Sequence, residues 1–375
     1  MRTAAVIGGG IGGLATAVGL VRHGWDVDVH ERAPEFNEVG AGISLWGNAC
    51  TALDALGVGD QVRAVASYPG RGGFRDRRGR WLMRGSTDEN ELLMVHRADL
   101  LRVLLDALPE KALHPGTRID DVRIEGGRAV VNSTTVDLVV GADGLRSGVR
   151  DTLWPDAAAP KYAGLTSWRM VLPAATITPF DGCETWGDGL VFGAFRMGGD
   201  RLYCYAAAPS LEGGRGPHGE LAELRRLFDG WPAPIPAILA TVEAQAVLRH
   251  DLYYLPPLAS YVHGPVALIG DAAHAMTPHL GQGACQALED AATLSVLACH
   301  PSLVAGLREY DDLRRGRTQQ VVRRSLAAGR MAHLPSKPGA ALRNAAVHAM
   351  PSSVLRRSML ALLKWHPPVV DSLTA

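Results

Sequence analysis

The chain has 375 residues, of which 47% are apolar and 20% are charged, and its formal net charge at pH 7 is zero. This balance gives no overall field toward nucleic acid or an anionic membrane, so we expect neither as a partner. No stretch reaches the roughly 20 apolar residues that a membrane-spanning helix needs. The length favours about two domains.

Five cysteines lie far apart, at positions 50, 183, 204, 285 and 299. None has the spacing of a metal site, so we expect reduced thiols and no metal. The first residues lack the long apolar region of a signal peptide. These features predict a cytoplasmic protein. Its positive charge is carried almost entirely by arginine, which favours a bacterial source.

The amino-terminal residues have the pattern of a βαβ unit. Residues 3–7 are an apolar run typical of a buried parallel strand, and a glycine-rich stretch follows at once. Residues 14–23 alternate small and apolar side chains at helical spacing, and Gly24 ends this helix. Residues 27–31 predict the second strand. The order of these elements indicates a dinucleotide-binding site.

The glycines between the first strand and the helix explain how such a site works. Gly8 permits a tight turn, Gly10 lets the backbone approach a pyrophosphate, and Gly13 brings the helix close to the strand. Gly12 completes the fingerprint. Glu31 ends the second strand, about where an acidic residue binds an adenosine ribose hydroxyl. Such a site can hold NAD or FAD.

Two later segments repeat the pattern of an apolar strand that runs into a polar turn. Residues 137–141 lead into Ala142-Asp143-Gly144, with Arg146 and Arg150 close behind. Residues 266–269 lead into Gly270-Asp271, and a loop containing Pro278 then reaches Gly281-Gln282-Gly283 at the start of a predicted helix.

With these three segments in order, the chain resembles the single-component FAD-dependent aromatic hydroxylases, the group A flavoprotein monooxygenases. Smaller matches are Gly40-Ala41-Gly42-Ile43, residues 96–100 and Trp365-His366-Pro367-Pro368, so the resemblance spans essentially the whole chain. It implies an α/β fold with a Rossmann-like FAD-binding domain, an inserted and mainly antiparallel β-sheet substrate domain, and C-terminal helices.

The resemblance also implies roles for single residues. Asp271 would bind the ribityl or pyrophosphate region of FAD, and Arg97 the ribityl chain or the phosphates. The backbone of residues 281–283 would face the flavin N1 and C2 carbonyl, and Asp143 would lie where FAD meets the nicotinamide cofactor. A helix cap at Asp271, a surface arginine at Arg97 and a turn residue at Asp143 are the alternatives. Three further residues are assigned to the cofactor site: Arg32, Gly42 and Ile119.

The domain boundaries follow from the same pattern. Residues 1–65, 93–159 and 256–305 are expected to form the FAD-binding domain. Residues 66–92 and 160–255 are expected to form the substrate-binding domain, because period-2 alternation in the second stretch predicts antiparallel strands. Residues 306–375 predict a helical segment whose arginines form a solvated face. We expect Arg146 and Arg150 to be solvated as well.

Three residues are candidates for catalysis. Arg169 could bind a carboxylate or enolate, or form a salt bridge at the sheet edge. Tyr203 could contact the substrate or pack as a half-buried aromatic residue. His279 lies beside the Gly281-Gln282-Gly283 turn, so it could contact the substrate or donate a proton, or be an ordinary loop histidine.

The resemblance implies that NADH or NADPH reduces FAD, that O₂ adds at flavin C4a, and that the hydroperoxyflavin transfers one oxygen atom to a small aromatic or otherwise electron-rich substrate. No second glycine fingerprint follows a strand, so the nicotinamide cofactor is expected to bind transiently. A flavin halogenase is disfavoured because its Trp-x-Trp-x-Ile-Pro motif is absent. A flavin-binding redox sensor or scaffold stays open, as do monomer and homodimer.

Overall fold

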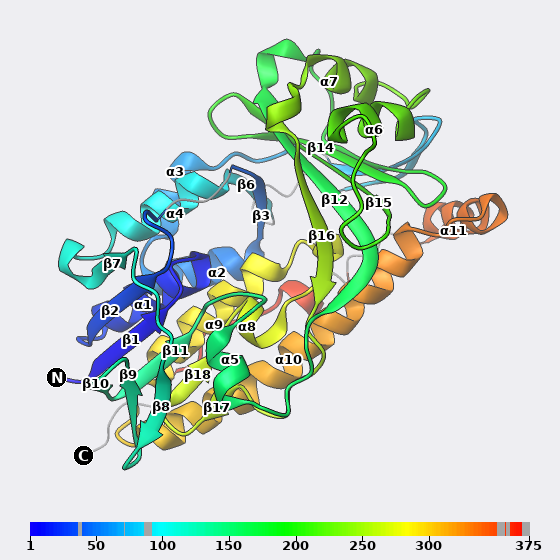
Figure 1. Cartoon of the computed structure of the whole chain (residues 1–375). Coiled ribbons are helices and arrows are strands. Elements are labelled where there is room, and N and C mark those ends of the chain that lie inside the picture. The colour runs from blue at the N-terminus through cyan, green and yellow to red at the C-terminus, as the bar shows by residue number, and fades with distance from the viewer. Residues whose placement is uncertain (37–39, 71, 86–91, 351–356, 358–360, 370–375) are drawn as a thin grey trace.

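Two sheets and a long helix organise the molecule, which is described from a computed structural model (Figure 1). The structure describes residues 1–36, 40–70, 72–85, 92–350, 357 and 361–369. Within these ranges no helix is long and apolar enough to cross a membrane.

The first sheet has six strands, and all neighbours in it are parallel except the β17–β18 pair at one edge. In spatial order the strands are β17 (Val262–His263), β18 (Val266–Leu268), β11 (Leu138–Gly141), β1 (Thr3–Ile7), β2 (Asp26–Glu31) and β7 (Leu113–Pro115). The central strands are buried apolar runs, as expected for a parallel sheet covered on both faces. Because parallel strands share one carboxyl edge, the turns after β1, β11 and β18 meet there.

Helices and smaller sheets cover this parallel sheet. Gly19 of one helix packs so closely on Ser295 of another that a Cβ at Gly19 would lie 2.5 Å from the serine Oγ. These two helices are α1 (Ile11–Arg22) and α9 (Gly283–Leu297), and near them lie α2 (Gly47–Leu56), α3 (Gly59–Val65) and α4 (Arg97–Asp106). The remaining elements are η1 (Glu110–Ala112), α5 (Gly148–Leu153), α8 (Asp271–His274), η4 (Pro278–Leu280), the β3–β6 pair (Gly42–Trp46, Leu92–His96) and the β8–β9–β10 sheet (Val122–Glu125, Arg128–Val131, Thr134–Val136).

The second sheet has seven strands, antiparallel except for the β13–β4 pair. In spatial order they are β16 (Leu248–Tyr254), β12 (Lys161–Pro173), β15 (Arg201–Pro209), β14 (Val191–Met197), β13 (Cys183–Trp186), β4 (Gly73–Asp76) and β5 (Trp81–Arg84). Alternate residues of β12, namely Trp168, Met170 and Leu172, enter a core with two helices on the outer face. Those helices are α6 (Glu220–Leu227) and α7 (Ile235–Thr241), with η2 (Ala174–Thr176) and η3 (Ala244–Ala246) nearby. The intervening residues of β12 face the other way.

The carboxyl-terminal part contains α10 (Leu303–Ala332) and α11 (Lys337–Ala349). Figure 1 shows α10 running from the parallel sheet toward the seven-stranded sheet, with α11 at its far end. The expectation of a solvated arginine face is wrong for Arg314, which is 1% exposed, and Arg343 is 4% exposed. The α/β fold class with a parallel sheet, an inserted antiparallel sheet and C-terminal helices is confirmed. The functions assigned to the three sets of residues stay predictions.

Candidate functional site

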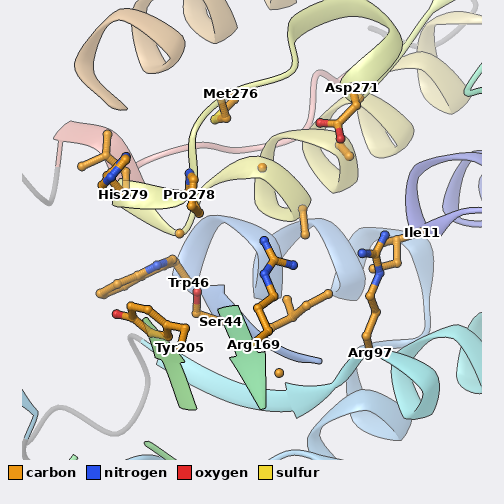
Figure 2. Close-up of a pocket in the computed structure, with 18 of the residues that line it drawn as sticks. Ile11, Ser44, Trp46, Arg97, Arg169, Tyr205, Asp271, Met276, Pro278 and His279 are labelled. Carbon is orange, nitrogen blue, oxygen red and sulfur yellow. The ribbon is translucent and has the colours of Figure 1, made fainter. Parts of the chain in front are cut away.

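A cavity of about 1500 Å³ lies between the two sheets. It is larger than the roughly 300–1000 Å³ of a site for one small ligand, so it has room for a dinucleotide and a second molecule. Most of the residues assigned from the sequence line it; Gly13 and Gln282 do not. Figure 2 shows one part of this cavity, with residues of the seven-stranded sheet on one side and the segment after β18 on the other.

The glycine turn forms one end of the cavity. Gly8 has a φ of +112°, and its N–H donates to the His30 carbonyl at 2.8 Å. A Cβ at Gly13 would lie 2.0 Å from the Gly8 oxygen, so only glycine lets α1 start so close to the strand. Gly13 therefore acts from behind the cavity wall. The α1 amino terminus, with its unpaired N–H groups, fits a pyrophosphate there.

Glu31 lines the same end of the cavity. Its Oε2 accepts a hydrogen bond from the Gly9 N–H at 2.7 Å, and its Oε1 accepts one from the Ala33 N–H at 2.8 Å. Two backbone donors thus orient the carboxylate, and each oxygen keeps a lone pair for a ribose hydroxyl. Arg32 and Ile119 line this end too, so the three residues lie where an adenosine group fits.

The middle of the cavity is bounded by charged residues from three elements. Arg97 is the first residue of α4, and its backbone N–H donates to the Ala41 carbonyl at 2.9 Å. Burial lowers the pKa of Arg97, Arg169 lowers it further, and Asp271 opposes both effects. Figure 2 shows Arg97 and Arg169 side by side, with Asp271 across the cavity. Two cations and one anion in this space fit the phosphates and hydroxyls of a cofactor.

The segment after β18 supplies backbone to the cavity. Gly281 has a φ of +60°, and a Cβ there would lie 2.6 Å from the Ser44 Oγ. A Cβ at Gly283 would meet no atom within 4 Å, because this position opens onto the cavity. The side chain of Gln282 points away and is fully buried, and its Oε1 accepts from the Asn48 Nδ2 at 3.0 Å. Only the backbone of Gln282 can therefore serve the cofactor.

The Asp-Gly segment after β11 lines the cavity beside the glycine turn. The Oδ2 of Asp143 accepts from the Val149 N–H at 3.1 Å, whereas its buried Oδ1 has no partner among the described residues. The expectation that Arg150 is solvated is wrong, because it is 1% exposed. It donates to the Ala272 carbonyl at 3.1 Å and the Leu145 carbonyl at 2.9 Å, which ties the two cofactor segments together. Arg146 is exposed, as expected.

Sequence reasoning missed a buried polar network beneath the amino terminus of α9. Arg314 donates from its Nε to Asp290 at 2.7 Å and also bonds Glu289. Asp290 accepts further from the Gly270 N–H at 2.9 Å and contacts the His274 Nε2 at 2.5 Å. Burial alone would raise the pKa of Asp290, but His274 and Arg314 lower it to about 2. The network holds the Gly-Asp turn and the start of α9 in one arrangement.

The three catalytic candidates all line the cavity. Arg169 of β12 points into its centre (Figure 2). Tyr203 is 8% exposed, and a Cβ at Gly42 would lie 2.3 Å from its Cγ, so Gly42 makes room for this ring. Burial raises the pKa of Tyr203, and nearby Arg169 lowers it. These contacts place Tyr203 beside the cofactor end rather than free in the cavity.

His279 lies at the other end of the part shown in Figure 2, near Trp46 and Tyr205. Its ring packs edge-on against His333, with the ring centroids 5.2 Å apart. Burial and His333 lower the pKa of His279 to about 3, so the ring is neutral at ordinary pH. The roles of Arg169, Tyr203 and His279 stay predictions. Glu184 of β13 also lines the cavity, and the sequence had not indicated it.

Similarity to known proteins agrees with this site. Residues 1–178 and 256–325 match the model of a family described as an FAD binding domain. The aurachin C monooxygenase/isomerase of Stigmatella aurantiaca is 36% identical over 346 residues, which cover 88% of this chain and 89% of that protein. The 2-heptyl-3-hydroxy-4(1H)-quinolone synthase of Pseudomonas aeruginosa is 34% identical over 375 residues, which cover 95% and 96%.

A solved structure extends the similarity to three dimensions. Klebsiella pneumoniae HpxO, complexed with FAD and uric acid, matches with a TM-score of 0.88 and 28% identity over 96% of each chain. The unpaired N–H groups at two helix starts and the open position at Gly283 fit FAD in this chain as well. The chain belongs to the family of single-component FAD-dependent hydroxylases and monooxygenases.

Proposed function

We propose that this monooxygenase uses NADH or NADPH and O₂ to hydroxylate a small aromatic or otherwise electron-rich substrate. The observation that carries the proposal is one continuous cavity, which runs from the dinucleotide turn to the aromatic face of the seven-stranded sheet. A cofactor and a substrate can meet only in such a shared space. One similar protein is a quinolone synthase and another was solved with uric acid bound, which supports an aromatic substrate.

In this proposal the cofactor lies along the residues already described. Glu31 binds the adenosine ribose, the α1 amino terminus faces the pyrophosphate, and Arg97 with Asp271 holds the ribityl region. Residues 281–283 present backbone N–H groups to the flavin ring. When bound, FAD would supply the redox chemistry, namely acceptance of a hydride from NAD(P)H and activation of O₂ for transfer to the substrate.

The chain's own side chains have three tasks in the substrate half. Arg169 orients the substrate by donating to an oxygen atom on its ring. Tyr203 packs on Gly42 and closes the side of the cavity next to the cofactor. His279 stays neutral because burial and His333 lower its pKa to about 3, and it offers an uncharged ring to the substrate. Aromatic walls on the far side exclude water.

The experiment measures NADH and NADPH oxidation by the purified FAD-loaded protein across phenols, hydroxypyridines, purines and quinolones. We expect slow oxidation alone and faster flavin reduction when a true substrate is present, as rapid mixing can resolve. The product should contain one oxygen atom from isotopically labelled O₂. A protein that binds FAD but oxidises neither nucleotide with any ring compound would contradict the proposal and favour a redox sensor.

Two further expectations stay predictions. Gel filtration with light scattering decides between monomer and homodimer. Cell fractionation tests the cytoplasmic location.

A further inference from the structure

One face of the seven-stranded sheet lines the cavity. It carries a row of side chains whose charge and polarity change from one strand to the next. Directly paired residues on neighbouring strands lie on the same face of a sheet. The row runs through Arg169, Tyr205, Gly193, Glu184, Phe74 and Met83, one residue from each of six consecutive strands. It therefore passes from a cation through a phenol to a carboxyl group and ends on apolar side chains.

Gly193 is the residue that makes the middle of this row possible. A Cβ at Gly193 would lie 2.2 Å from the Cζ of Tyr205, so only glycine lets the tyrosine ring lie flat across β14. The Tyr205 hydroxyl thereby reaches β13 and donates to the Oε2 of Glu184. From the same strand, the Trp186 Nε1–H donates to the Oε1. Both carboxyl oxygens act as acceptors, and each keeps one further lone pair.

This carboxyl group has no counterion in the part of the chain that the structure describes. Among the described residues, none of the ion pairs includes Glu184, and its only polar side-chain partners are Tyr205 and Trp186. Burial raises the pKa of Glu184, and the two donated hydrogen bonds lower it in part. An enclosed carboxylate without a counterion is costly unless more donors reach it. The open side of Glu184 faces the cavity, so the missing donor belongs to the ligand.

The two ends of the row restrict what that ligand can be. Arg169 and Arg97 disfavour a cationic ligand in this cavity, and Glu184 disfavours a carboxylate at its own edge. Beyond Glu184 the cavity wall is apolar: the Phe74 and Trp186 rings lie 4.7 Å apart, and Met83 and Val347 belong to the same cluster. These features favour a neutral ring that has an N–H donor and an apolar substituent.

Building on the proposed function, we infer that Glu184 is a substrate-binding residue that accepts a hydrogen bond from the ring N–H of a neutral heteroaromatic substrate. Arg169 contacts an oxygen atom at the other end of the ring. An alkyl substituent of the substrate extends over Phe74 and Met83 toward Val347.

The test uses 2-alkyl-4-quinolones and their N-methyl counterparts, with binding followed by the change in the flavin spectrum of the FAD-loaded enzyme. The N–H form should bind roughly tenfold to a hundredfold more tightly, the range for a charge-assisted hydrogen bond. Glu184→Gln should lose most of this preference while retaining FAD. Lengthening the 2-alkyl group should tighten binding about fourfold per methylene until the apolar pocket is filled.

Asp188→Asn is the matched control, because Asp188 lies just after the strand that carries Glu184 but pairs with Arg77 and does not line the cavity. It should leave the preference unchanged. Equal binding of N–H and N-methyl ligands by the unaltered enzyme, or an unchanged preference in Glu184→Gln, would overturn the inference. The ligand pair on the unaltered enzyme gives a result even if Glu184→Gln does not fold. Because binding is measured without turnover, failure of oxidation alone would count against the proposed function and not against Glu184.

Discussion

Replacing Gly283 by alanine should change protein stability and FAD affinity in opposite directions. An added Cβ meets no protein atom within 4 Å, so the fold without cofactor accepts it without strain. Alanine is a better helix former than glycine, which stabilises α9 by up to about 1 kcal/mol. The same methyl group occupies cavity space where the flavin should approach the first N–H groups of the helix. Losing two such hydrogen bonds costs about 1–3 kcal/mol, or roughly fivefold to 150-fold in Kd.

The assay compares urea unfolding of the FAD-free protein with FAD titration by fluorescence quenching. Gly316→Ala is the control, because Gly316 is an exposed α10 residue whose Cβ would also meet nothing within 4 Å. It should stabilise the protein without affecting FAD. In Gly283→Val that retains cofactor, the flavin reduction potential should fall, because the helix end stabilises anionic reduced flavin less. Full FAD affinity and an unchanged potential in both Gly283 variants would refute the placement of the flavin at this helix.

Two further predictions concern buried ionisable groups. Arg314→Ala should lower the free energy of unfolding by about 3–5 kcal/mol, because it leaves Asp290 buried without an arginine and Glu289 paired with Arg317 alone. Arg315→Ala, which removes only a partly exposed pair with Asp311, should cost at most about 1 kcal/mol in the same urea unfolding; equal losses would contradict the network. The pKa of His279 is lowered in the folded protein from 6.5 to about 3. Between these two pH values the histidine takes up a proton only when the protein unfolds, which favours the unfolded state. The free energy of unfolding should therefore be about 1.4 kcal/mol lower at pH 5.5 than at pH 8. His279→Gln should remove this loss of stability at low pH, whereas His218→Gln, at an exposed histidine, should not. If the free energy of unfolding has the same pH dependence in all three proteins, His279 is already protonated in the folded protein at pH 5.5.

The cofactor half of the molecule could be predicted from the sequence because its determinants are local. Gly8, Gly13 and Glu31 act within one βαβ unit, and their spacing alone sets the geometry of the turn. The meeting of the later segments follows from the shared carboxyl edge of parallel strands. Here the sequence pattern and the structure agree on the fold and on most residues of the cavity wall.

The substrate half could not be predicted in the same way. The position of Glu184 beside Tyr205 depends on the register of β13, β14 and β15, and on a glycine at position 193 that reads as an ordinary strand residue. The arginines show the same difficulty. Nothing in the local sequence separates Arg314, which is buried among carboxylates, from its partly exposed neighbour Arg315, because the partners of Arg314 lie on another helix.

Helix α10 joins two tasks, one at the cofactor segments and one at the cavity wall. Arg314 holds the network beneath the cofactor segments, and Ala328 with Met331 forms part of the cavity wall about 21–26 Å farther along the same helix. A change in the direction of the helix axis would therefore displace both the network at Arg314 and the cavity wall at Ala328 and Met331. The strands carrying Phe74 and Met83 pack against the same apolar cluster as Ala332 at the end of α10. A substitution on those strands that shifts Ala332 would therefore also act on the helix that carries Arg314, so substrate scope and cofactor geometry are mechanically coupled.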